Sequence, residues 1–300
     1  MLSFAYVKLA NMITDQETNL VYFSDLLPKR HPAFFKELKA ILERKRIEYG
    51  ILPQTNDIWC RDYMPVQVSK NEFVQFKYDP KYLHTKKYIK TITDTTNVCK
   101  VIGVESVASD IKLDGGNIVK SRTKAILTSR IFDENRRYGK DDLLRKIKRL
   151  LKVKQVIVVP ECPLDRYGHA DGMIRFVDGI KDEKTILVND FSGEKARFFS
   201  RFHRELTRQG LFPVLLPYTA YRNKGDDAKG IYINYLQIGK VVIYPTYGIK
   251  EDVLAHKVFS RYFGDNVFPI RSNQIAKKGG VLNCVSWNIK GGSYAGVKCS

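Results

Sequence analysis

Apolar residues along the chain recur in short blocks that alternate between helix-like and strand-like spacing. Helical spacing predicts helices at 33–48, 139–152, 194–209 and 250–263. Runs rich in β-branched and aromatic residues predict strands at 74–79, 125–129, 155–160, 185–190, 212–217, 231–239, 240–245 and 267–270. A tight turn at Gly239 and Lys240 should join the strand pair at 231–245. The alternation predicts an α/β protein built from small mixed units.

The chain shows no boundary between domains. Its 300 residues are 44% hydrophobic and 28% charged, as in ordinary globular proteins, and no Pro-, Ser- or Gly-rich linker interrupts them. We therefore expect a single domain over residues 1–300. Met12 is an alternative start, so residues 1–11 are expected to be a non-native or disordered extension.

Cysteine usage favours a reducing compartment. The five cysteines are widely spaced and contain no CxxC pair, which argues against a disulfide framework or a zinc knuckle. The N-terminus lacks the basic start, apolar core and cleavage site of a signal peptide. No apolar run approaches the roughly 18 residues that span a bilayer. The sequence thus predicts a cytoplasmic protein without a membrane partner.

The net charge of +19 is the one unusual feature of the composition. The basic segment at 136–154 would fit RNA binding. Its leucine and isoleucine residues recur at helical spacing, however, so the basic residues are expected to form the solvated face of an amphipathic helix. Nucleic acid is therefore not the expected partner, and no sequence feature predicts an oligomer.

Four segments place polar residues in apolar or glycine-rich surroundings. They are DIWCRDYMP at 57–65, KLDGGNIV at 112–119, RYGHADGMIRFVDG at 166–179 and KKGGVLNCVSWNIKGG at 277–292. Taken singly, each is a weak signal, because glycine pairs often mark turns and an isolated histidine is usually structural. Together they single out one Cys, one His and three Asp residues.

Zinc and phosphate sites are alternatives for these residues. Imidazole and carboxylate groups would suit zinc at His169 and Asp171. The other histidines are scattered without ligand spacing, however, and no HExxH motif occurs. Neither GxGxxG nor GxxxxGK[ST] occurs, so a phosphate loop is not indicated.

The remaining set suits a planar cationic substrate. Carboxylates bind a guanidinium through paired charge-assisted hydrogen bonds, and a thiolate can attack its central carbon. A histidine can protonate the departing ammonia near neutral pH. Because alternate residues of an extended segment project to the same face, His169 and Asp171 are expected to meet one ligand.

The order of the four motifs resembles the agmatine deiminase and Porphyromonas-type peptidylarginine deiminase family. The pattern is WxRD, an acid before GGN, GHxDxxxRF, and a glycine-rich turn that ends in Cys, over about residues 16–292. The resemblance implies a pentein fold, a five-bladed β/α propeller of ββαβ units around a central active site. It also implies hydrolysis of a guanidine to a ureido product and ammonia, without a metal or organic cofactor. For agmatine as substrate, this reaction belongs to putrescine biosynthesis.

Seven residues match functional positions of that family. They are Cys284 (nucleophile), His169 (general acid and base), Asp171 and Asp62 (guanidinium binding), Asp114 (orientation of the histidine), Trp59 (aromatic wall) and Asn234 (polar lining). Asp114 stands where many relatives have Glu, and Asn283 where agmatine deiminases typically have His. The carboxylates implied around the thiol should raise its pKa until a guanidinium binds.

The resemblance leaves function open at two points. An amidinotransferase would share the chemistry but pass the amidino group to an amine, and a silent basic scaffold would bind RNA. Agmatine needs an acid or polar group for its distal amine, free arginine a cation for its carboxylate, and a peptide an open cleft. Arg61, Arg166 and Arg175 lie near motif residues, and each is expected to be structural.

Overall fold

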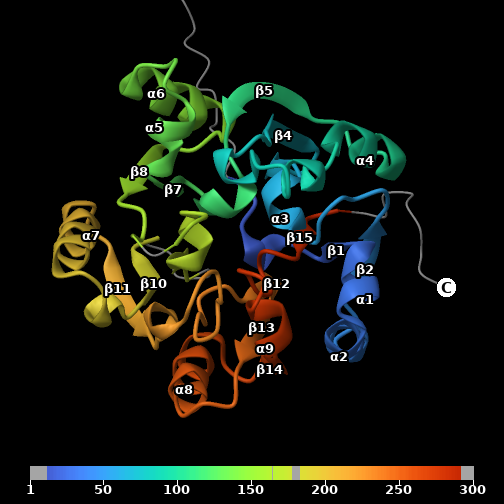
Figure 1. Ribbon diagram of the computed structural model, residues 1–300, viewed down its shortest axis with the longest axis vertical. Helices are drawn as coiled ribbons and strands as arrows, with labels where there is room; N and C mark the ends of the chain where they lie inside the picture. The colour runs from blue at the N-terminus through green and yellow to red at the C-terminus, as the bar shows by residue number, and fades with distance from the viewer. Residues whose placement is uncertain (1–11, 164, 178–182, 292–300) are drawn as a thin grey trace, which may run out of the picture.

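The strands of the protein form five separate three-stranded sheets that surround a common centre (Figure 1). This computed structural model describes residues 12–163, 165–177 and 183–291. The middle strand of every sheet pairs antiparallel with one neighbour and parallel with the other. The five sheets are therefore five copies of one unit, the blade of a propeller.

The blades follow one another along the chain. The strands are β1 (Leu20–Ser24), β2 (Glu48–Leu52), β3 (Val66–Ser69), β4 (Glu72–Lys77), β5 (Val107–Lys112), β6 (Val119–Lys120), β7 (Lys124–Thr128), β8 (Gln155–Val159), β9 (Ile174–Phe176), β10 (Thr185–Asn189), β11 (Phe212–Leu216), β12 (Leu236–Ile238), β13 (Val241–Thr246), β14 (Val267–Arg271) and β15 (Trp287–Ile289). Consecutive triplets from β3 to β14 make four blades, and β15, β1 and β2 make the fifth.

Helices connect the parallel strands within the blades, because parallel strands need a crossover connection. The helices are α1 (Leu26–Arg30), α2 (Pro32–Arg44), α3 (Cys60–Tyr63), α4 (Thr95–Ile102), α5 (Arg130–Glu134), α6 (Lys140–Leu150), α7 (Ala196–Arg208), α8 (Glu251–Phe263) and α9 (Asn273–Ala276). The longer helices α2, α4, α6, α7 and α8 lie on the outside of the ring (Figure 1). This arrangement confirms the expected α/β propeller of ββαβ units.

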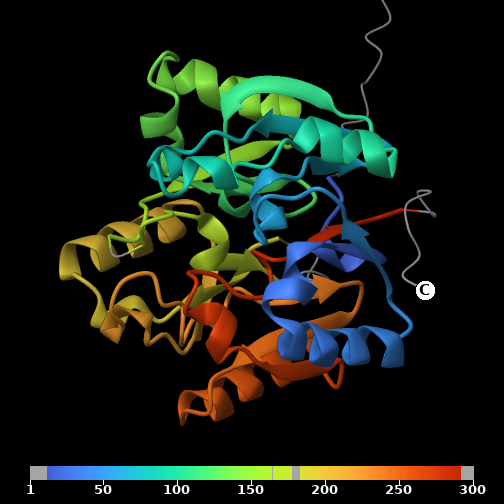
Figure 2. The same ribbon diagram turned by 45° about the vertical axis from the view of Figure 1, so that its right-hand side comes forward.

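The ring closes where the last strand joins the first. β15 lies antiparallel to β1, with Trp287 opposite Tyr22, and the two strands can be followed in Figure 2. The Trp287 ring packs on Tyr22 and Phe73, with ring centroids 5.5 and 5.9 Å apart. Its indole N–H donates a hydrogen bond of 2.7 Å to the carbonyl of Pro65. Trp287 therefore joins the blade of β15, β1 and β2 to the blade of β3, β4 and β5.

Two predicted elements are shorter in the structure than expected. The helix predicted at 33–48 ends at Arg44, because Arg46 has a φ of 54° and turns the chain into β2. Of the strand predicted at 231–239, only Leu236–Ile238 joins the sheet. The side chain of Asn234 bonds instead to other connections between blades. The predicted turn at Gly239 is confirmed, since β12 and β13 pair directly across it.

Seven strands were not predicted from the sequence, namely β1, β2, β3, β5, β6, β9 and β15. β6 has two residues and β9 and β15 have three, which is too short for a periodic pattern. Half of the residues of β5 are exposed and only one is buried, so its sequence carries little apolar signal. Pairing with neighbouring strands, rather than local sequence, determines these elements.

The basic helix is amphipathic, as predicted. Leu143 and Ile147 of α6 are buried, whereas several of its basic residues are exposed. No helix in the described ranges is long and apolar enough to cross a membrane. The extension expected at 1–11 lies outside the described residues, and the assignment of 1–300 to a single domain stays a prediction.

Replacing Trp287 with Ala should lower the free energy of unfolding by about 3–5 kcal/mol, because a buried aromatic ring and a buried hydrogen bond are lost. Urea denaturation followed by far-UV circular dichroism would measure the change. Val253→Ala on α8, whose residue is 60% exposed, is the control and should change stability by less than about 0.5 kcal/mol. A similar small effect of Trp287→Ala would show that this side chain does not hold the ring closed.

Candidate active site

The five connections between successive blades meet at one cavity of about 530 Å³. Each connection lies between the last strand of one blade and the first strand of the next. Each supplies candidate residues of the site: Trp59 and Asp62 from the first, Asp114 from the second, His169 and Asp171 from the third, Asn234 from the fourth and Cys284 from the fifth. The propeller thus brings together the seven residues that the sequence singled out.

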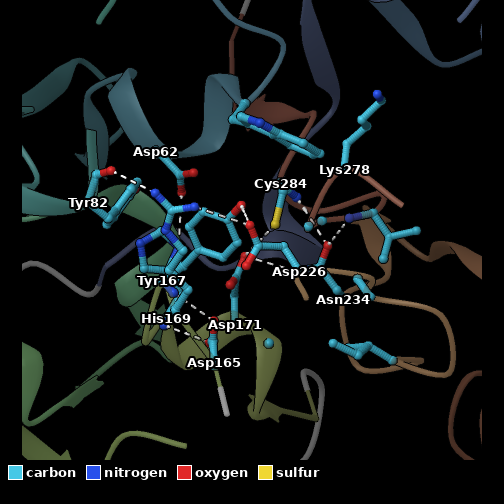
Figure 3. A pocket seen from close by; sticks show the side chains of 18 of the residues that line it. Asp62, Tyr82, Asp165, Tyr167, His169, Asp171, Asp226, Asn234, Lys278 and Cys284 are labelled. Atoms are coloured by element: carbon cyan, nitrogen blue, oxygen red, sulfur yellow. Dashed lines mark hydrogen bonds and ion pairs between the residues drawn. The ribbon is translucent and has the colours of Figure 1, made fainter. Parts of the chain in front are cut away.

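Six of these seven residues line the cavity itself, and Asp114 lies behind His169. Figure 3 shows the side chains of Asp62, His169, Asp171 and Cys284 pointing toward a common centre. Asp62, His169 and Asp171 are each less than 9% exposed. The cavity therefore presents buried charged groups at its inner end.

The imidazole of His169 is held between two carboxylates. Its Nε2 lies 2.9 Å from Oδ2 of Asp114, and its Nδ1 lies 3.5 Å from Oδ1 of Asp62. The shorter acid at position 114 therefore reaches the histidine although many relatives have Glu there. With both ring nitrogens facing carboxylates, the site favours the doubly protonated imidazolium.

Tyr82 is a member of the site that the sequence did not reveal. Its hydroxyl donates a hydrogen bond of 2.7 Å to Oδ2 of Asp114, the oxygen that also faces His169. Its ring packs edge-on against Tyr167, with centroids 5.2 Å apart, and both tyrosines line the cavity. Tyr82 follows β4 in a short turn without any motif, so only the structure places it here.

Asp171 is fixed by two amides. Asn234 and Asn283 donate hydrogen bonds of 3.1 and 2.6 Å to its Oδ2. The thiol of Cys284 lies 3.8 Å from the same oxygen. Asn283, in the position where agmatine deiminases typically have His, therefore acts on a carboxylate of the site. Its position beside Cys284 in the motif was the only sequence signal for this contact.

Cys284 sits in a turn that is anchored to the rest of the site. Its backbone N–H donates to Oδ1 of Asn234 at 3.3 Å, and its carbonyl accepts from the N–H of Arg61 at 3.1 Å. A Cβ added to Gly280 would lie 2.7 Å from the Trp59 ring and 3.1 Å from the Cys284 sulfur. Glycine is therefore required where the turn passes between the Cys284 thiol and the Trp59 ring.

Glycine is required for a similar steric reason in the pair at 115–116. A Cβ on Gly116 would lie 2.5 Å from Oδ1 of Asp62 and 2.7 Å from Nδ1 of His169. The Gly116 N–H instead donates to Oδ1 of Asp62 at 3.1 Å. The close packing at Gly116 therefore links three groups that are far apart in sequence, namely the acid before Gly-Gly, the aspartate of the WxRD motif and the histidine.

One premise of the sequence analysis is wrong. The segment from His169 to Asp171 is not extended, because Ala170–Gly172 forms a turn of 3₁₀ helix and only His169 has extended backbone angles. Both side chains nevertheless line the same cavity. The turn, rather than strand alternation, places them there.

The arginines near the motifs separate into two groups. Arg61 bonds to the carbonyl of Asn283 at 3.3 Å, and Arg175 bonds to the carbonyl of Tyr235 at 3.0 Å. Neither of these arginines lines the cavity, whereas Arg166 does. Cys162 is buried and lines the cavity as well. No group of three or more His, Cys, Asp or Glu residues in the described ranges could hold a metal ion, so the zinc alternative finds no support there.

Comparison with known proteins agrees with this geometry. The sequence model of the Porphyromonas-type peptidyl-arginine deiminase family matches residues 2–289. The chain belongs to this family. Over 222 residues it is 24% identical to a protein of Streptococcus mutans named "Putative agmatine deiminase". That match covers 63% of this chain and 60% of the relative, so the chain spans well under two thirds of the relative's length.

Solved structures of agmatine deiminases share the fold of this family member. The enzyme from C. jejuni superposes with a TM-score of 0.74 at 20% identity, over 96% of this chain and 97% of the other. The enzyme from Enterococcus faecalis superposes with a TM-score of 0.75 at 17% identity, over 93% and 95%. Similarity at this level of identity establishes the shared propeller fold.

Burial and charge shift the pKa values in this deiminase-family site. Burial lowers the pKa of His169, but the carboxylates of Asp62 and Asp114 outweigh it and raise the value to about 10. Burial, together with the charges of Asp114 and Asp171, raises the pKa of Asp62 to about 8. Burial and the carboxylates of Asp171 and Asp62 raise the pKa of the Cys284 thiol well above its usual range. At pH 7 the empty site therefore holds an imidazolium and a neutral thiol.

The alkylation rate of Cys284 should therefore keep rising with pH beyond the usual thiol pKa of about 8.5. Iodoacetamide labelling, quantified by mass spectrometry of the peptide that contains Cys284, would measure the profile. Asp171→Asn should shift the profile to lower pH, because it removes a neighbouring negative charge. Cys284→Ala gives the background from the other cysteines. A plateau below pH 7 in the unsubstituted protein would contradict the expectation.

Proposed function

We propose that the protein hydrolyses a guanidine group to a ureido product and ammonia through a covalent adduct on Cys284. The observation that carries this proposal is the pair of buried carboxylates, Asp62 and Asp171, that share one cavity with the Cys284 thiol and the His169 imidazole. A buried cluster with excess negative charge favours a cationic ligand. A planar guanidinium can bond two carboxylates at once and expose its carbon to the thiolate.

The two carboxylates have oxygens available for this ligand. Protein donors engage Oδ1 of Asp62 and Oδ2 of Asp171. Among the hydrogen bonds of the described residues, none reaches Oδ2 of Asp62 or Oδ1 of Asp171. These two oxygens are the acceptors that we assign to the guanidinium N–H groups.

The first half of the proposed reaction forms the adduct. Binding of the cation lowers the pKa of the Cys284 thiol, which loses its proton. The thiolate sulfur then forms a bond to the guanidine carbon. His169, held as an imidazolium by Asp62 and Asp114, donates a proton to the departing amino group, and the C–N bond breaks to release ammonia.

The second half releases the product. His169 is now neutral and takes a proton from a water molecule, whose oxygen bonds to the carbon of the thiouronium adduct. The C–S bond breaks, the proton of the added hydroxyl passes to the departing sulfur, the carbon becomes the carbonyl of a ureido group, and the Cys284 thiol is restored. Asp114 keeps the imidazole oriented through both halves, because its Oδ2 lies 2.9 Å from Nε2 of His169 and is itself held by a hydrogen bond from the Tyr82 hydroxyl.

Ligand binding should release protons, because a guanidinium lowers the pKa of Asp62 from about 8. In the Cys284→Ala variant at pH 7, calorimetric titration with a guanidine ligand should give binding enthalpies that differ between buffers of high and low ionisation enthalpy. The Cys284→Ala protein that also carries Asp62→Asn is the control, because it has no carboxyl group at position 62 to ionise and the release should shrink. Equal enthalpies in both buffers at pH 7 would contradict this coupling.

The decisive experiment measures ammonia and ureido product from agmatine, free arginine and an arginine-containing peptide. Turnover without any amine acceptor, lost in Cys284→Ala, would establish hydrolysis and separate it from amidino transfer. His169→Asn should lower kcat about 10²- to 10⁴-fold. Cys162→Ala is the matched control, because Cys162 lines the same cavity and its thiol faces Glu194, which has no role in the proposed reaction. Equal turnover by Cys284→Ala would refute the mechanism, and salt-dependent RNA binding without turnover would favour a silent scaffold.

We further propose that the protein acts in the cytoplasm, which its widely spaced cysteines support. A place in putrescine biosynthesis would follow only if agmatine is the substrate.

A further inference from the structure

We propose that the outer end of the cavity selects guanidine substrates whose distal group is a carboxylate, with Lys277 and Lys278 as the residues that determine this specificity. This inference rests on the proposed guanidine chemistry and concerns only the other end of the substrate. The sequence alone left the choice open between an acid for agmatine and a cation for a carboxylate.

Basic side chains gather at the outer part of the cavity. Five of them line it, namely Arg30, Lys87, Arg166, Lys277 and Lys278, and all five residues are exposed. Asp62 and Asp171 at the inner end are buried. The cavity therefore has carboxylates at its inner end, and toward solvent the five cations outnumber the acids Asp57, Asp165 and Asp226.

The loop that carries the two lysines also forms part of the cavity wall. Gly279 and Gly280 follow directly, and their backbones pack against Tyr167 and Trp59 so closely that a Cβ would lie 2.6 and 2.7 Å from those side chains. In Figure 3 the ammonium of Lys278 points away from the Cys284 thiol. The lysines are thus tied to the wall of the site, but they do not compete for the guanidinium end.

The acids near this outer end are already engaged by protein donors. Oδ2 of Asp226 accepts from Arg166 at 3.3 Å and from the Tyr167 hydroxyl at 3.4 Å. Oδ1 of Asp57 accepts from Arg30 at 3.4 Å and from the N–H of Ile58 at 2.7 Å. Each of these carboxylates is thus paired with an arginine, which offsets its negative charge at the outer end.

A third acid of the lining, Asp165, is committed to its own loop. Its carboxylate accepts hydrogen bonds from the backbone N–H groups of Tyr167 at 2.8 Å and His169 at 3.3 Å. By contrast, Lys87, Lys277 and Lys278 form no ion pair with a carboxylate among the described residues. The outer end therefore has an excess of uncompensated positive charge.

Two titratable groups of the lining lie near these cations, and the positive charge contributes to the shifts of their pKa values. Burial, then the charges of Lys278 and Arg30, lowers the pKa of His31. A hydrogen bond from Lys87 and the charges of Lys87 and Arg166 lower the pKa of Tyr88. A neighbouring positive charge moves both groups in this direction, because it disfavours imidazolium and favours phenolate.

The charge pattern disfavours the binding of agmatine and favours the binding of a guanidino acid. Agmatine carries a second positive charge that would face the lysines, whereas a guanidino carboxylate is complementary at both ends. The net charge of +19 adds a long-range repulsion of dications, which a substrate with a carboxylate reduces. The carboxylate could belong to a free guanidino acid such as arginine or to the carboxyl end of a peptide, since both present the same group.

The test compares agmatine with 5-guanidinopentanoate, which has the same chain of four methylene groups and a carboxylate in place of the ammonium. We expect kcat/KM to favour the carboxylate about tenfold or more at low salt, and the preference to shrink as salt is added. Lys277→Glu and Lys278→Glu should each raise KM for 5-guanidinopentanoate about fivefold, leave kcat nearly unchanged, and improve agmatine turnover. Lys257→Glu on the outer helix α8 changes the net charge equally and should change neither substrate.

Free arginine, arginine amide and a dipeptide with carboxyl-terminal arginine identify the source of the carboxylate. Preference for arginine over its amide supports the proposal, and the dipeptide shows whether the group belongs to a free acid or a peptide end. The inference would be overturned, with guanidine hydrolysis left intact, if agmatine were turned over as well as 5-guanidinopentanoate. It would also be overturned if Lys277→Glu and Lys278→Glu left the ratio of kcat/KM for the two substrates unchanged. Absence of ureido product from every guanidine would instead overturn the proposed function.

Discussion

The structure depends on keeping three carboxylates and one imidazole buried together at the centre of a ring. Asp62, Asp114 and Asp171 would repel one another in a region with little water. The imidazolium of His169 compensates part of this charge, and neutral donors from Gly116, Tyr82, Asn234 and Asn283 bond to the carboxylates. The remaining negative charge makes the centre receptive to a cation. The mutual repulsion of the carboxylates destabilises the buried cluster, and the same excess charge favours binding of a cationic ligand.

The propeller explains how these groups can be held so closely. Every blade ends in a connection that crosses toward the centre, and the ring is closed by β15 against β1. Hydrogen bonds between connections then fix each side chain from two or more blades, as the bonds of Asn234 to Asp171 and to the N–H of Cys284 illustrate. A site assembled in this way is rigid, because no single loop carries it.

Polarity along the cavity is a second consequence of this assembly. The buried inner end is lined by side chains whose hydrogen-bond partners lie on neighbouring connections. The rim carries exposed lysines on the loop that precedes Cys284. In the proposed mechanism, chemistry and substrate choice are therefore located on the same short segment, with the Cys284 thiol at one end and the basic residues at the other. On that proposal, changes at the rim would alter which guanidine enters without disturbing the groups that act on it.

The sequence by itself determined the α/β class and most of the longer helices and strands, and its resemblance to a known family pointed to the seven residues of the site. It did so because buried strands and amphipathic helices have local periodicities, and because glycine is required where Gly116 and Gly280 pass next to reactive groups. Only the tertiary structure revealed Tyr82, the role of Asn283 and the turn at 170–172, since these depend on contacts between residues far apart in the chain. The short strands β6, β9 and β15 likewise form because neighbouring strands pair with them, an interaction that no local pattern records.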